Sequence, residues 1–171
     1  YAMGTWDIGA LRMIAGVRVE NTQFNAIGNQ VDVAENGRTA TVTPREASSS
    51  YTNVLPGLHL RYDSGNDWVL RFAANKTLSR PSFGDVSPRV SINRGDEEVS
   101  IGNPDLNPYR STNLDLSFEK YIGSTGLVSL GVFNKSIDDY IVQTLSTTDA
   151  EFPGLQVTRS INGDTAKVRG A

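Results

Sequence analysis

Side chains able to do chemistry are sparse in this chain, and the densest group of them lies in one short segment. Residues 102–108 alternate glycine and proline with amide and carboxylate side chains, and a tyrosine follows. Amide, carboxylate and aromatic groups suit a sugar, while an arginine suits an anionic ligand. The same composition also predicts a rigid loop and a strand end, because proline fixes φ and Asn or Asp caps its own turn. With both interpretations open, the candidate ligand-binding residues are Arg80, Asn103, Asp105 and Tyr109.

Other polar clusters have structural explanations. His59 is the only histidine, and a metal site would need partner ligands. The acidic run 96–98 lacks the Asp-x-Asp spacing of a calcium loop and predicts a solvated loop apex. Asp138 and Asp139 are adjacent, and adjacent strand residues point to opposite faces, so the two carboxylates cannot act on one glycosidic bond. A bulge or a strand end at this pair is the better interpretation.

The chain shows no arrangement typical of an enzyme. It has no Gly-x-Ser-x-Gly elbow, no phosphate-binding glycine loop and no cysteine. We therefore predict a protein that is not an enzyme, with no catalytic residue, no metal and no cofactor. The net charge of −3 and the scattered Lys and Arg residues argue against a nucleic-acid partner.

The dominant pattern is an alternation of apolar and polar residues. In residues 11–20, one face reads Leu, Met, Ala, Val, Val and the other reads Arg, Ile, Gly, Arg, Glu. A period of two indicates a β-strand with two unlike faces, of which one suits lipid and the other a watery lumen. Because a membrane-spanning strand is short and half polar, the lack of a long apolar run carries no weight against a membrane.

This pattern predicts an all-β fold of about six or seven strands. We expect an antiparallel up-and-down meander that forms part of a large transmembrane β-barrel, with short periplasmic turns and long extracellular loops. The long loops are expected at 23–50, where a small hairpin is the open alternative, and at 81–110 and 146–155. The expected strands are 1–6, 10–22, 51–62, 68–80, 111–122, 127–145 and 156–171.

One hairpin has a specific predicted register. If Tyr62 lies opposite Trp68, then Leu60 faces Leu70 and Leu58 faces Phe72, while His59 faces Arg71 and Arg61 faces Val69 on the polar side. The two aromatic residues then lie at one end of the hairpin, where a membrane-interface girdle is expected. Charged residues of the polar side predict either a salt-bridged wall or a transport path: Arg12, Arg18, Glu20, Arg61, Arg71, Asp115 and Glu119.

Several segments resemble the C-terminal barrel of TonB-dependent outer-membrane receptors. The main one runs from Gly-Asn-Pro-Asp-Leu-Asn-Pro at 102–108 through the strand that ends with Glu-Lys-Tyr at 119–121. Segments 16–22, 70–83 and 133–141 are also similar to that family and occur in the family's order. Together these segments are similar to those of the receptor branch associated with carbohydrate uptake.

The resemblance implies active uptake of a scarce nutrient, an oligosaccharide or a ferric siderophore, across the outer membrane of a Gram-negative bacterium. In such receptors a plug domain lies inside a 22-stranded barrel. Residues 1–171 are then one partial barrel domain, without plug or TonB box, that supplies wall and extracellular loops. The implied partners are outer-membrane lipid, the rest of the barrel and its plug, the ligand, and the TonB-ExbB-ExbD system acting through the N-terminal part. A soluble all-β module that binds glycans, built as a sandwich, is the alternative.

Overall fold

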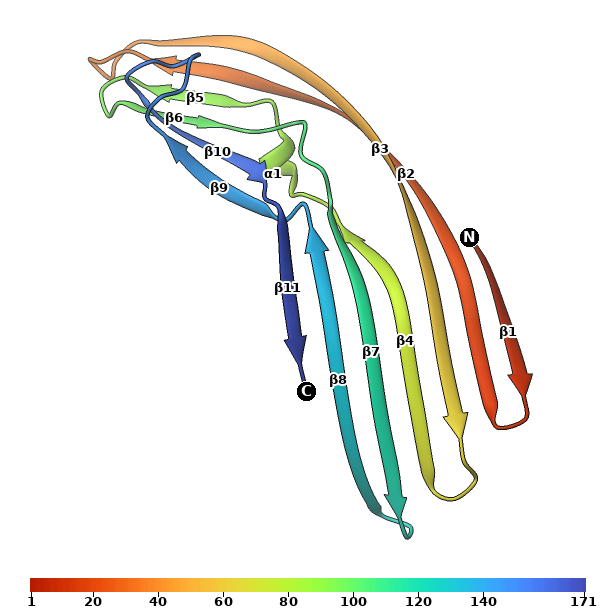
Figure 1. Cartoon of the computed structure of the whole chain (residues 1–171). Helices are drawn as coiled ribbons and strands as arrows, with labels where there is room; N and C mark the ends of the chain where they lie inside the picture. The colour runs from red at the N-terminus through yellow and green to blue at the C-terminus, as the bar shows by residue number, and fades with distance from the viewer.

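A computed structural model describes residues 1–171 and shows one long, curved sheet (Figure 1). A single helix, α1 (Phe83–Val86), interrupts the strands, and no helix is long and apolar enough to cross a membrane. The strands are β1 (Ala2–Ile8), β2 (Leu11–Val33), β3 (Ala40–Asp63), β4 (Trp68–Ser79), β5 (Val90–Asn93), β6 (Glu98–Ile101), β7 (Tyr109–Ile122), β8 (Gly126–Asp138), β9 (Ile141–Ser146), β10 (Gln156–Asn162) and β11 (Thr165–Gly170).

The sheet has two parts, which we call the wall and the cap. The wall consists of β1, β4, β7, β8, β11 and the halves of β2 and β3 that lie next to their short turns; all its pairings are antiparallel. The cap consists of α1, β5, β6, β9 and β10, at the end of the molecule where the long connections lie (Figure 1). It joins the outer end of β2, beyond the wall, by parallel pairing of β5 with Gln30–Val33, and β6 pairs in parallel with β10.

The prediction of an all-β, largely antiparallel sheet is confirmed, but the expected meander of six or seven strands differs from the structure in two respects. The sheet has 11 strands, and two of its pairings are parallel. Residues 23–50, expected as a long loop, are mostly the outer halves of β2 and β3, which stay paired from Leu11 and Tyr62 up to Val33 and Ala40. This region is rich in Asn, Ser and Thr and looks like a loop in sequence, but continuous pairing with a neighbour overrides weak β-propensity.

Two expected strands are broken where they leave the wall. The strand predicted at 127–145 ends at Asp138 and restarts at Ile141, where it pairs with β10 instead of a wall strand. Asp139 has a φ of 58°, so the backbone turns there, as the interpretation of a strand end at Asp138 and Asp139 required. The predicted strand 156–171 is likewise split into β10 and β11, which pair with β9 and β8.

The predicted register of the β3–β4 hairpin is shifted by two residues. Tyr62 pairs with Leu70, and Leu60 pairs with Phe72. Arg61, predicted opposite Val69, pairs with Arg71, and His59 pairs with Ala73. The turn is shorter than expected, because pairing continues beyond Tyr62: Asp63 pairs with Val69, and the Ser64 amide donates to the Trp68 carbonyl at 3.1 Å. A shift of two keeps every side chain on its predicted face, because strand side chains repeat every second residue.

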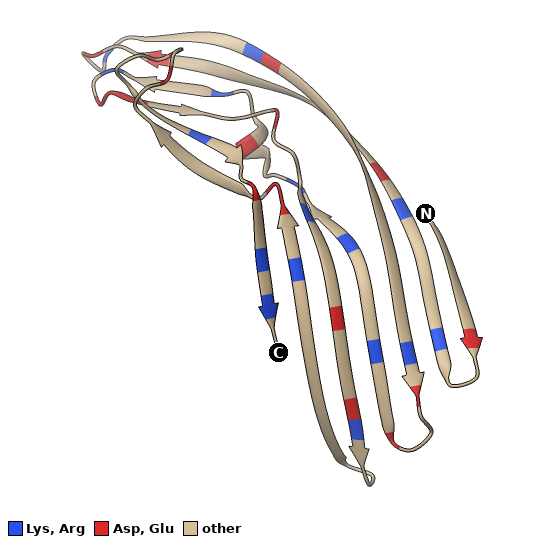
Figure 2. Cartoon of the chain, viewed as in Figure 1, with Lys and Arg blue, Asp and Glu red and all other residues tan.

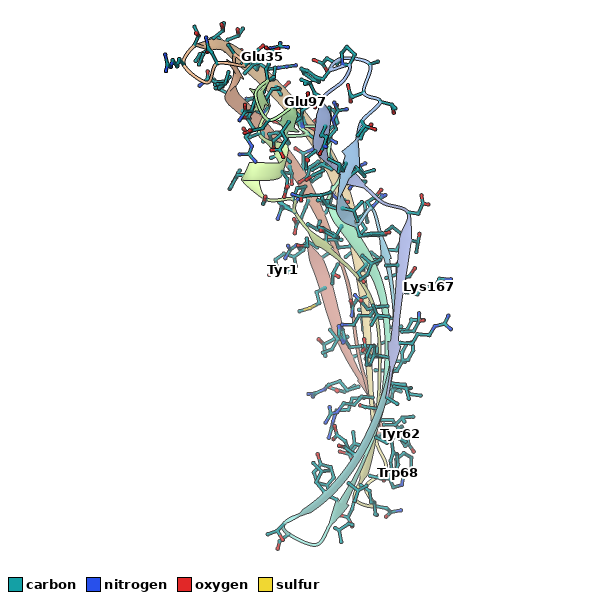
Figure 3. All side chains as sticks on the ribbon, turned by 90° about the vertical axis from the view of Figure 1, so that its left-hand side faces the viewer. Tyr1, Glu35, Tyr62, Trp68, Glu97 and Lys167 are labelled. Atoms are coloured by element: carbon teal, nitrogen blue, oxygen red, sulfur yellow. The ribbon has the colours of Figure 1, made fainter.

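The wall has two chemically distinct faces. Figure 3 views the sheet nearly edge-on: Tyr62, Trp68 and Lys167 emerge on one side, and Tyr1 emerges on the other. The side of Tyr62 is mostly apolar in its middle part, and we call it the apolar face; the opposite side is the polar face. The Tyr62 and Trp68 rings lie 5.4 Å apart, and Trp68 lies 6.1 Å from Phe118, which places an aromatic cluster near the short turns.

The upper edge of the apolar face slopes across the wall. On β2 the unbroken run of apolar residues on this face ends at Val19, whereas on β8 it ends at Val132, which lies level with Met13 through the paired strands between them. The edge thus falls by about 20 Å of strand length over four strand spacings of about 4.8 Å each. That slope corresponds to strands tilted by about 45° to the edge, close to the tilt found in membrane barrels.

Burial is concentrated in the cap. Its core contains Val90, Ile92, Val99, Phe152 and Val157. On the wall, by contrast, large apolar side chains stay exposed, for example Leu130 at 64% and Val128 at 57%. A sandwich would bury such a face under a second sheet, and this chain forms only one sheet, so the fold does not support the sandwich alternative.

Candidate functional site

The polar face carries three arginines side by side on neighbouring strands. Arg12 pairs with Arg61 in the β2–β3 ladder, and Arg61 pairs with Arg71 in the β3–β4 ladder. Like charges placed directly opposite each other repel, so such a row needs counter-charges. The alternation of β2, β3 and β4 puts the three side chains on one face, and the register brings them level.

Each of these arginines has its own carboxylate. The Arg12 guanidinium donates to Asp7 at 2.7 Å, and that of Arg61 donates to Asp63 at 2.7 Å. Arg71 binds Glu119 through two hydrogen bonds of 3.0 and 3.1 Å, and the Tyr121 hydroxyl donates to the same carboxylate at 2.9 Å. The row is therefore an ion-pair network fixed in place, and not a set of free cations that could bind an anionic ligand.

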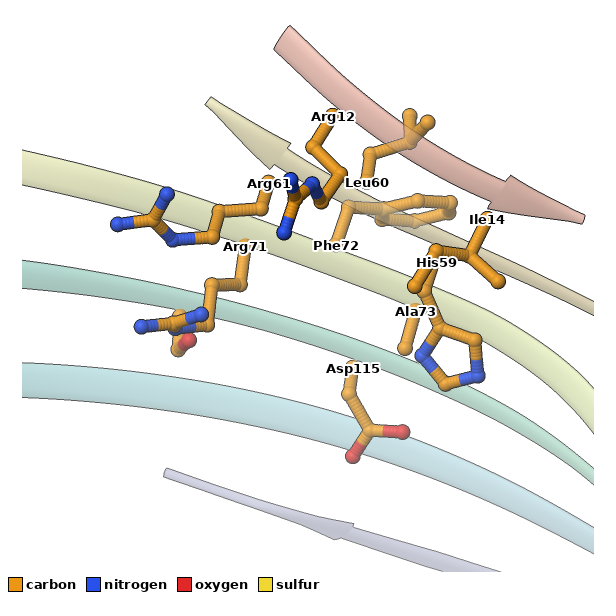
Figure 4. Close-up of a pocket in the computed structure, with 10 residues that line it drawn as sticks. Arg12, Ile14, His59, Leu60, Arg61, Arg71, Phe72, Ala73 and Asp115 are labelled. Carbon is orange, nitrogen blue, oxygen red and sulfur yellow. The ribbon is translucent and has the colours of Figure 1, made fainter. Parts of the chain in front are cut away.

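A hollow of about 370 Å³, lined by these arginines together with apolar residues such as Ile14 and Phe72, lies directly above this row (Figure 4). Ala73 is the small residue at its centre, with His59 on one neighbouring strand and Asp115 on the other. Both side chains point into the hollow, together with the arginines. Asp115 is the one charged residue predicted for this face that forms no ion pair. Arg18 and Glu20 also form an ion pair with each other. All the other charges predicted for this face are therefore paired, as the prediction of a salt-bridged wall requires.

A ladder of amides lies closer to the cap, where β4 separates from β3. The β3–β4 pairing ends at Gly57 and Asn75, next to Pro56, which has no N–H to contribute to a ladder. The Asn113 amide donates to Asn75 at 2.9 Å and to Thr77 at 3.2 Å. A second hollow, of about 460 Å³ and lined mainly by polar groups, opens here.

Asn53 is the residue of this second hollow that the sequence alone did not reveal. It is buried, and its Nδ2 has no hydrogen-bond partner in the protein. A buried amide donor without a partner costs free energy unless something else accepts its hydrogen bond. Only the register shows that this asparagine, one of many in the chain, faces a hollow beside Thr77 and Ser111.

Three of the four residues predicted as ligand contacts bind other parts of the protein through their side chains, namely Arg80, Asn103 and Tyr109. Tyr109 pairs with Ser79, the residue before Arg80, whereas Asn103 and Asp105 lie together in the loop 102–108. Arg80 donates to Glu20 at 2.5 Å and to Thr22 at 3.3 Å, which ties the end of β4 to β2. The Asn103 amide donates to the Ser160 carbonyl at 3.0 Å and its Oδ1 accepts from the Asp105 amide at 3.1 Å. The Tyr109 hydroxyl donates to the Ile141 carbonyl at 3.5 Å. Their role in ligand binding remains a prediction.

Gly102 shows how tightly this loop is held. A side chain on Gly102 would place its Cβ 2.0 Å from the Ser87 carbonyl oxygen, and the Gly102 amide donates to the Arg89 carbonyl at 3.0 Å. The loop 102–108 is thus packed against the segment after α1. Its only exposed carboxylate among the predicted contacts is that of Asp105.

The cap and the outer end of β2 are joined by a two-pronged ion pair. Arg94 donates to both carboxylate oxygens of Asp32, at 2.9 and 2.7 Å. The hydrogen bond from Arg94 holds the pKa of Asp32 below its usual range, and Asp32 in turn raises the pKa of Arg94. The loop that carries Arg94 is therefore anchored to the hairpin β2–β3 while both groups stay charged.

Comparison with known proteins assigns this architecture to a family. The family model described as TonB dependent receptor-like, beta-barrel matches residues 1–171. The chain belongs to the TonB-dependent receptor β-barrel family. Among the curated proteins no match is found.

Solved structures of TonB-dependent receptors share this fold at low sequence identity. The hemophore receptor HasR of Serratia marcescens matches with a TM-score of 0.67 and 16% identity, over 97% of this chain and 29% of that chain. The siderophore receptor PirA of Pseudomonas aeruginosa matches with a TM-score of 0.59 and 15% identity, over 94% of this chain and 30% of that chain. The copper transporter OprC matches with a TM-score of 0.61 and 16% identity, over 97% of this chain and 24% of that chain.

This TonB-dependent receptor chain therefore spans less than a third of the length of those relatives. The family is one of receptors and transporters and not of enzymes, and its members are outer-membrane proteins of Gram-negative bacteria. Within the chain, no group of His, Cys, Asp or Glu side chains is arranged to hold a metal ion.

Proposed function

We propose that residues 1–171 form wall and extracellular loops of an outer-membrane receptor that takes up a scarce nutrient, an oligosaccharide or a ferric siderophore. The observation that carries this proposal is the two-faced wall. Its apolar face is exposed and bounded by an aromatic cluster, and its polar face holds ordered ion pairs. Lipid on one side and a plugged lumen on the other would satisfy both faces at once.

The membrane orientation follows from the connections. The short turns, such as that between Asp63 and Trp68, lie on the periplasmic side, and the cap lies outside the cell. Asp63, Tyr62 and Trp68 then belong to the periplasmic end of the wall. The edge strands β1 and β11 pair with the remainder of the barrel, because an unpaired backbone edge in lipid costs several kcal/mol per polar group.

The ligand enters through the cap and contacts polar groups that the protein leaves unsatisfied. Asn53 is the strongest candidate, since its amide is buried beside a polar hollow and lacks a partner. Arg80, Asn103, Asp105 and Tyr109 complete the candidate set, with Asp105 as the one exposed carboxylate among them. Energy for uptake comes from the TonB-ExbB-ExbD system through the plug, which these residues do not form.

The wall gives no reason to choose one cargo. HasR is named as a hemophore receptor, PirA as a siderophore receptor and OprC as a copper transporter. All three share this fold with the chain at 15 or 16% identity. The cargo class is therefore a property of the loops and the plug. Asparagine and hydroxyl groups around the second hollow favour a ligand rich in hydrogen-bonding groups.

The test is uptake by cells that carry the full-length receptor. A deletion strain is supplied with labelled maltooligosaccharides or with ⁵⁵Fe-enterobactin, in cells with and without TonB. We expect TonB-dependent uptake of one probe class, and we expect Asn53→Ala to lower that uptake while Asn25→Ala, on the exposed outer half of β2, leaves it unchanged. Full-length receptor found in the soluble fraction, or TonB-independent uptake, would contradict the proposal.

A further inference from the structure

The upper rim of the apolar face differs between the two sides of the wall. The rim is the first polar position above the unbroken run of apolar side chains on each strand, and on β11 it is the residue that pairs with the rim residue of β8. On β2 and β3 it consists of Asn21 and Thr52, which hydrogen-bond to each other at 2.9 Å. On the other strands the rim contains cations. Its residues there are Lys76 on β4, Thr112 on β7, Asn134 on β8 and Arg169 on β11. A further cation, Lys167, lies two residues above Arg169 on the same face of β11.

The rim cations differ from the three arginines of the polar-face row in having no counter-charge. Lys76, Lys167 and Arg169 are exposed and take part in none of the ion pairs of the chain. The Arg169 Nε donates only to the neutral Asn134 amide oxygen, at 2.8 Å. Figure 2 shows β11 as a strand with two basic segments and no acidic one.

The register arranges these cations around hydroxyl groups. Lys76 pairs with Thr112, Thr112 with Ser136, and Ser136 with Lys167, so two ammonium groups flank two hydroxyls on one level. The span from β4 to β11 is three strand spacings, or about 14 Å. No Asp or Glu lies on the apolar face of the wall at or below this level. The first carboxylate above it is that of Asp138, which accepts from the Thr165 hydroxyl at 2.9 Å.

We propose that the rim of β4, β7, β8 and β11 binds the phosphate groups of an anionic lipid headgroup in the leaflet next to the cap. The inference rests on the proposed function, because it requires the apolar face to lie in a membrane. Long basic side chains at the edge of an apolar band reach toward headgroups, where they attract negative charge. Ala74, Leu114 and Val132 lie directly below the rim and supply an apolar surface for the acyl chains of the same lipid.

Charge complementarity selects this occupant over a neutral lipid or a second protein chain. Three cations that form no ion pair, with Asp138 two residues above Ser136 on the same face, would repel a basic surface and gain little from a zwitterionic headgroup. Phosphate oxygens accept hydrogen bonds from ammonium, guanidinium and hydroxyl groups, all of which are present here. On β2 and β3 the rim is neutral, so we expect the bound lipid to lie only over β4 to β11.

The experiment uses the full-length receptor, purified in a neutral detergent and titrated with phosphatidic acid while native mass spectrometry counts bound lipids. The test variant combines Lys76→Gln, Lys167→Gln and Arg169→Gln. One cation near an anionic surface is worth about fivefold in binding. We therefore expect the triple variant to bind phosphatidic acid at least about tenfold more weakly, and we expect phosphatidylcholine to bind weakly to both proteins.

The matched control is Lys135→Gln. Lys135 is also free of ion pairs and pairs with Asn113 just below the rim level, but it lies on the polar face, over the Phe133 ring at 5.7 Å. We expect this variant to bind phosphatidic acid like the wild type. A variant that keeps the charges, Lys76→Arg with Lys167→Arg and Arg169→Lys, is expected to retain most of the binding.

Three results would overturn the inference: equal binding by the wild type and the triple variant, an equal loss in Lys135→Gln, or equal binding of the two lipids. Inorganic phosphate that competes fully at micromolar concentration would also overturn it, because the site would then take free phosphate and not a lipid. Failure of the proposed function is a separate outcome. In that case the wild-type receptor would not insert into phosphatidylcholine vesicles, whereas failure of the inference alone leaves insertion intact.

Discussion

The cap and the wall are built from the same kind of alternating strand, yet they cover their apolar sides in different ways. In the cap, Ile92 and Val99 are 1% and 2% exposed, because β5, β6 and β10 enclose them together with Phe152. In the wall, Leu130 is 64% exposed because nothing in the chain covers it. Alternation shows that a strand has two faces, but not whether protein or lipid covers the apolar one.

The largest expected effect separates these two forms of burial. Ile92→Ala should destabilise the cap by about 2–5 kcal/mol, because the cavity cannot be filled by neighbours in a closed core. Hydrogen exchange of the full-length receptor should show faster exchange in β5, β6 and β10, with β7 and β8 unchanged. The control is Leu145→Ala, since Leu145 also lies in the cap but is 65% exposed and should change little. Equal effects of the two variants would mean that the cap has no core of its own.

A charge on the wall tests which face meets lipid. Leu130→Arg should destabilise the receptor in vesicles by up to about 2–4 kcal/mol, the cost of a guanidinium on the lipid face, which is largest at the middle of the bilayer. Ser129→Arg, one residue away on the polar face and paired with Glu119, should cost less than about 1 kcal/mol. Denaturant unfolding followed by far-UV circular dichroism measures both values. Reversal of their order would exchange the two faces of the wall.

A methyl group at Gly102 tests how rigidly the cap is joined to its loop. Gly102→Ala should cost about 1–3 kcal/mol, since the new Cβ would meet the Ser87 carbonyl oxygen. Gly84→Ala is the control, because its Cβ would lie no closer than 3.7 Å to a neighbouring atom. Thermal unfolding of the two variants gives the comparison. A loop that simply moves aside would leave the two melting temperatures equal.

The smallest effect concerns the ion pair that ties the cap to β2. Arg94 lowers the pKa of Asp32 in the folded protein, so the pair contributes stability above the unfolded pKa of an aspartate. That contribution is lost as the pH falls through the lower folded pKa. Hydrogen exchange of β5, measured between pH 7 and pH 3 and corrected for intrinsic rates, should therefore rise at the acidic end in the wild type. Asp32→Asn should show no such additional rise.

Much of the wall was predictable from local pattern. Residues 11–19 show their lipid-compatible face directly, and the predicted faces of Leu60, Arg61 and Phe72 are all confirmed despite the two-residue error in register. The prediction survives that error because side-chain direction depends on parity alone. The turn at 63–67 set the register, and its hydrogen bonds to Trp68 are not visible in residue types.

The cap was not predictable in the same way. Its strands are short, β5 and β6 having four residues each, and their partners β2 and β10 are distant in the sequence. The candidate residue Asn53 was missed for a related reason, since its burial depends on β4 leaving β3 after Gly57. No local signal marks an asparagine whose environment is set by strands that separate.

The sequence by itself determined that the chain forms two-faced strands and where the short turns of the wall lie, because parity and turn residues are local properties. It also determined the family, through segments such as 102–121. Only the tertiary structure decided that the long connections form a cap with its own core and that the arginine row is neutralised strand by strand. It also placed Lys76, Lys167 and Arg169 unpaired on one rim. Those features depend on which distant strands become neighbours, and pairing between distant strands is a property of the whole sheet.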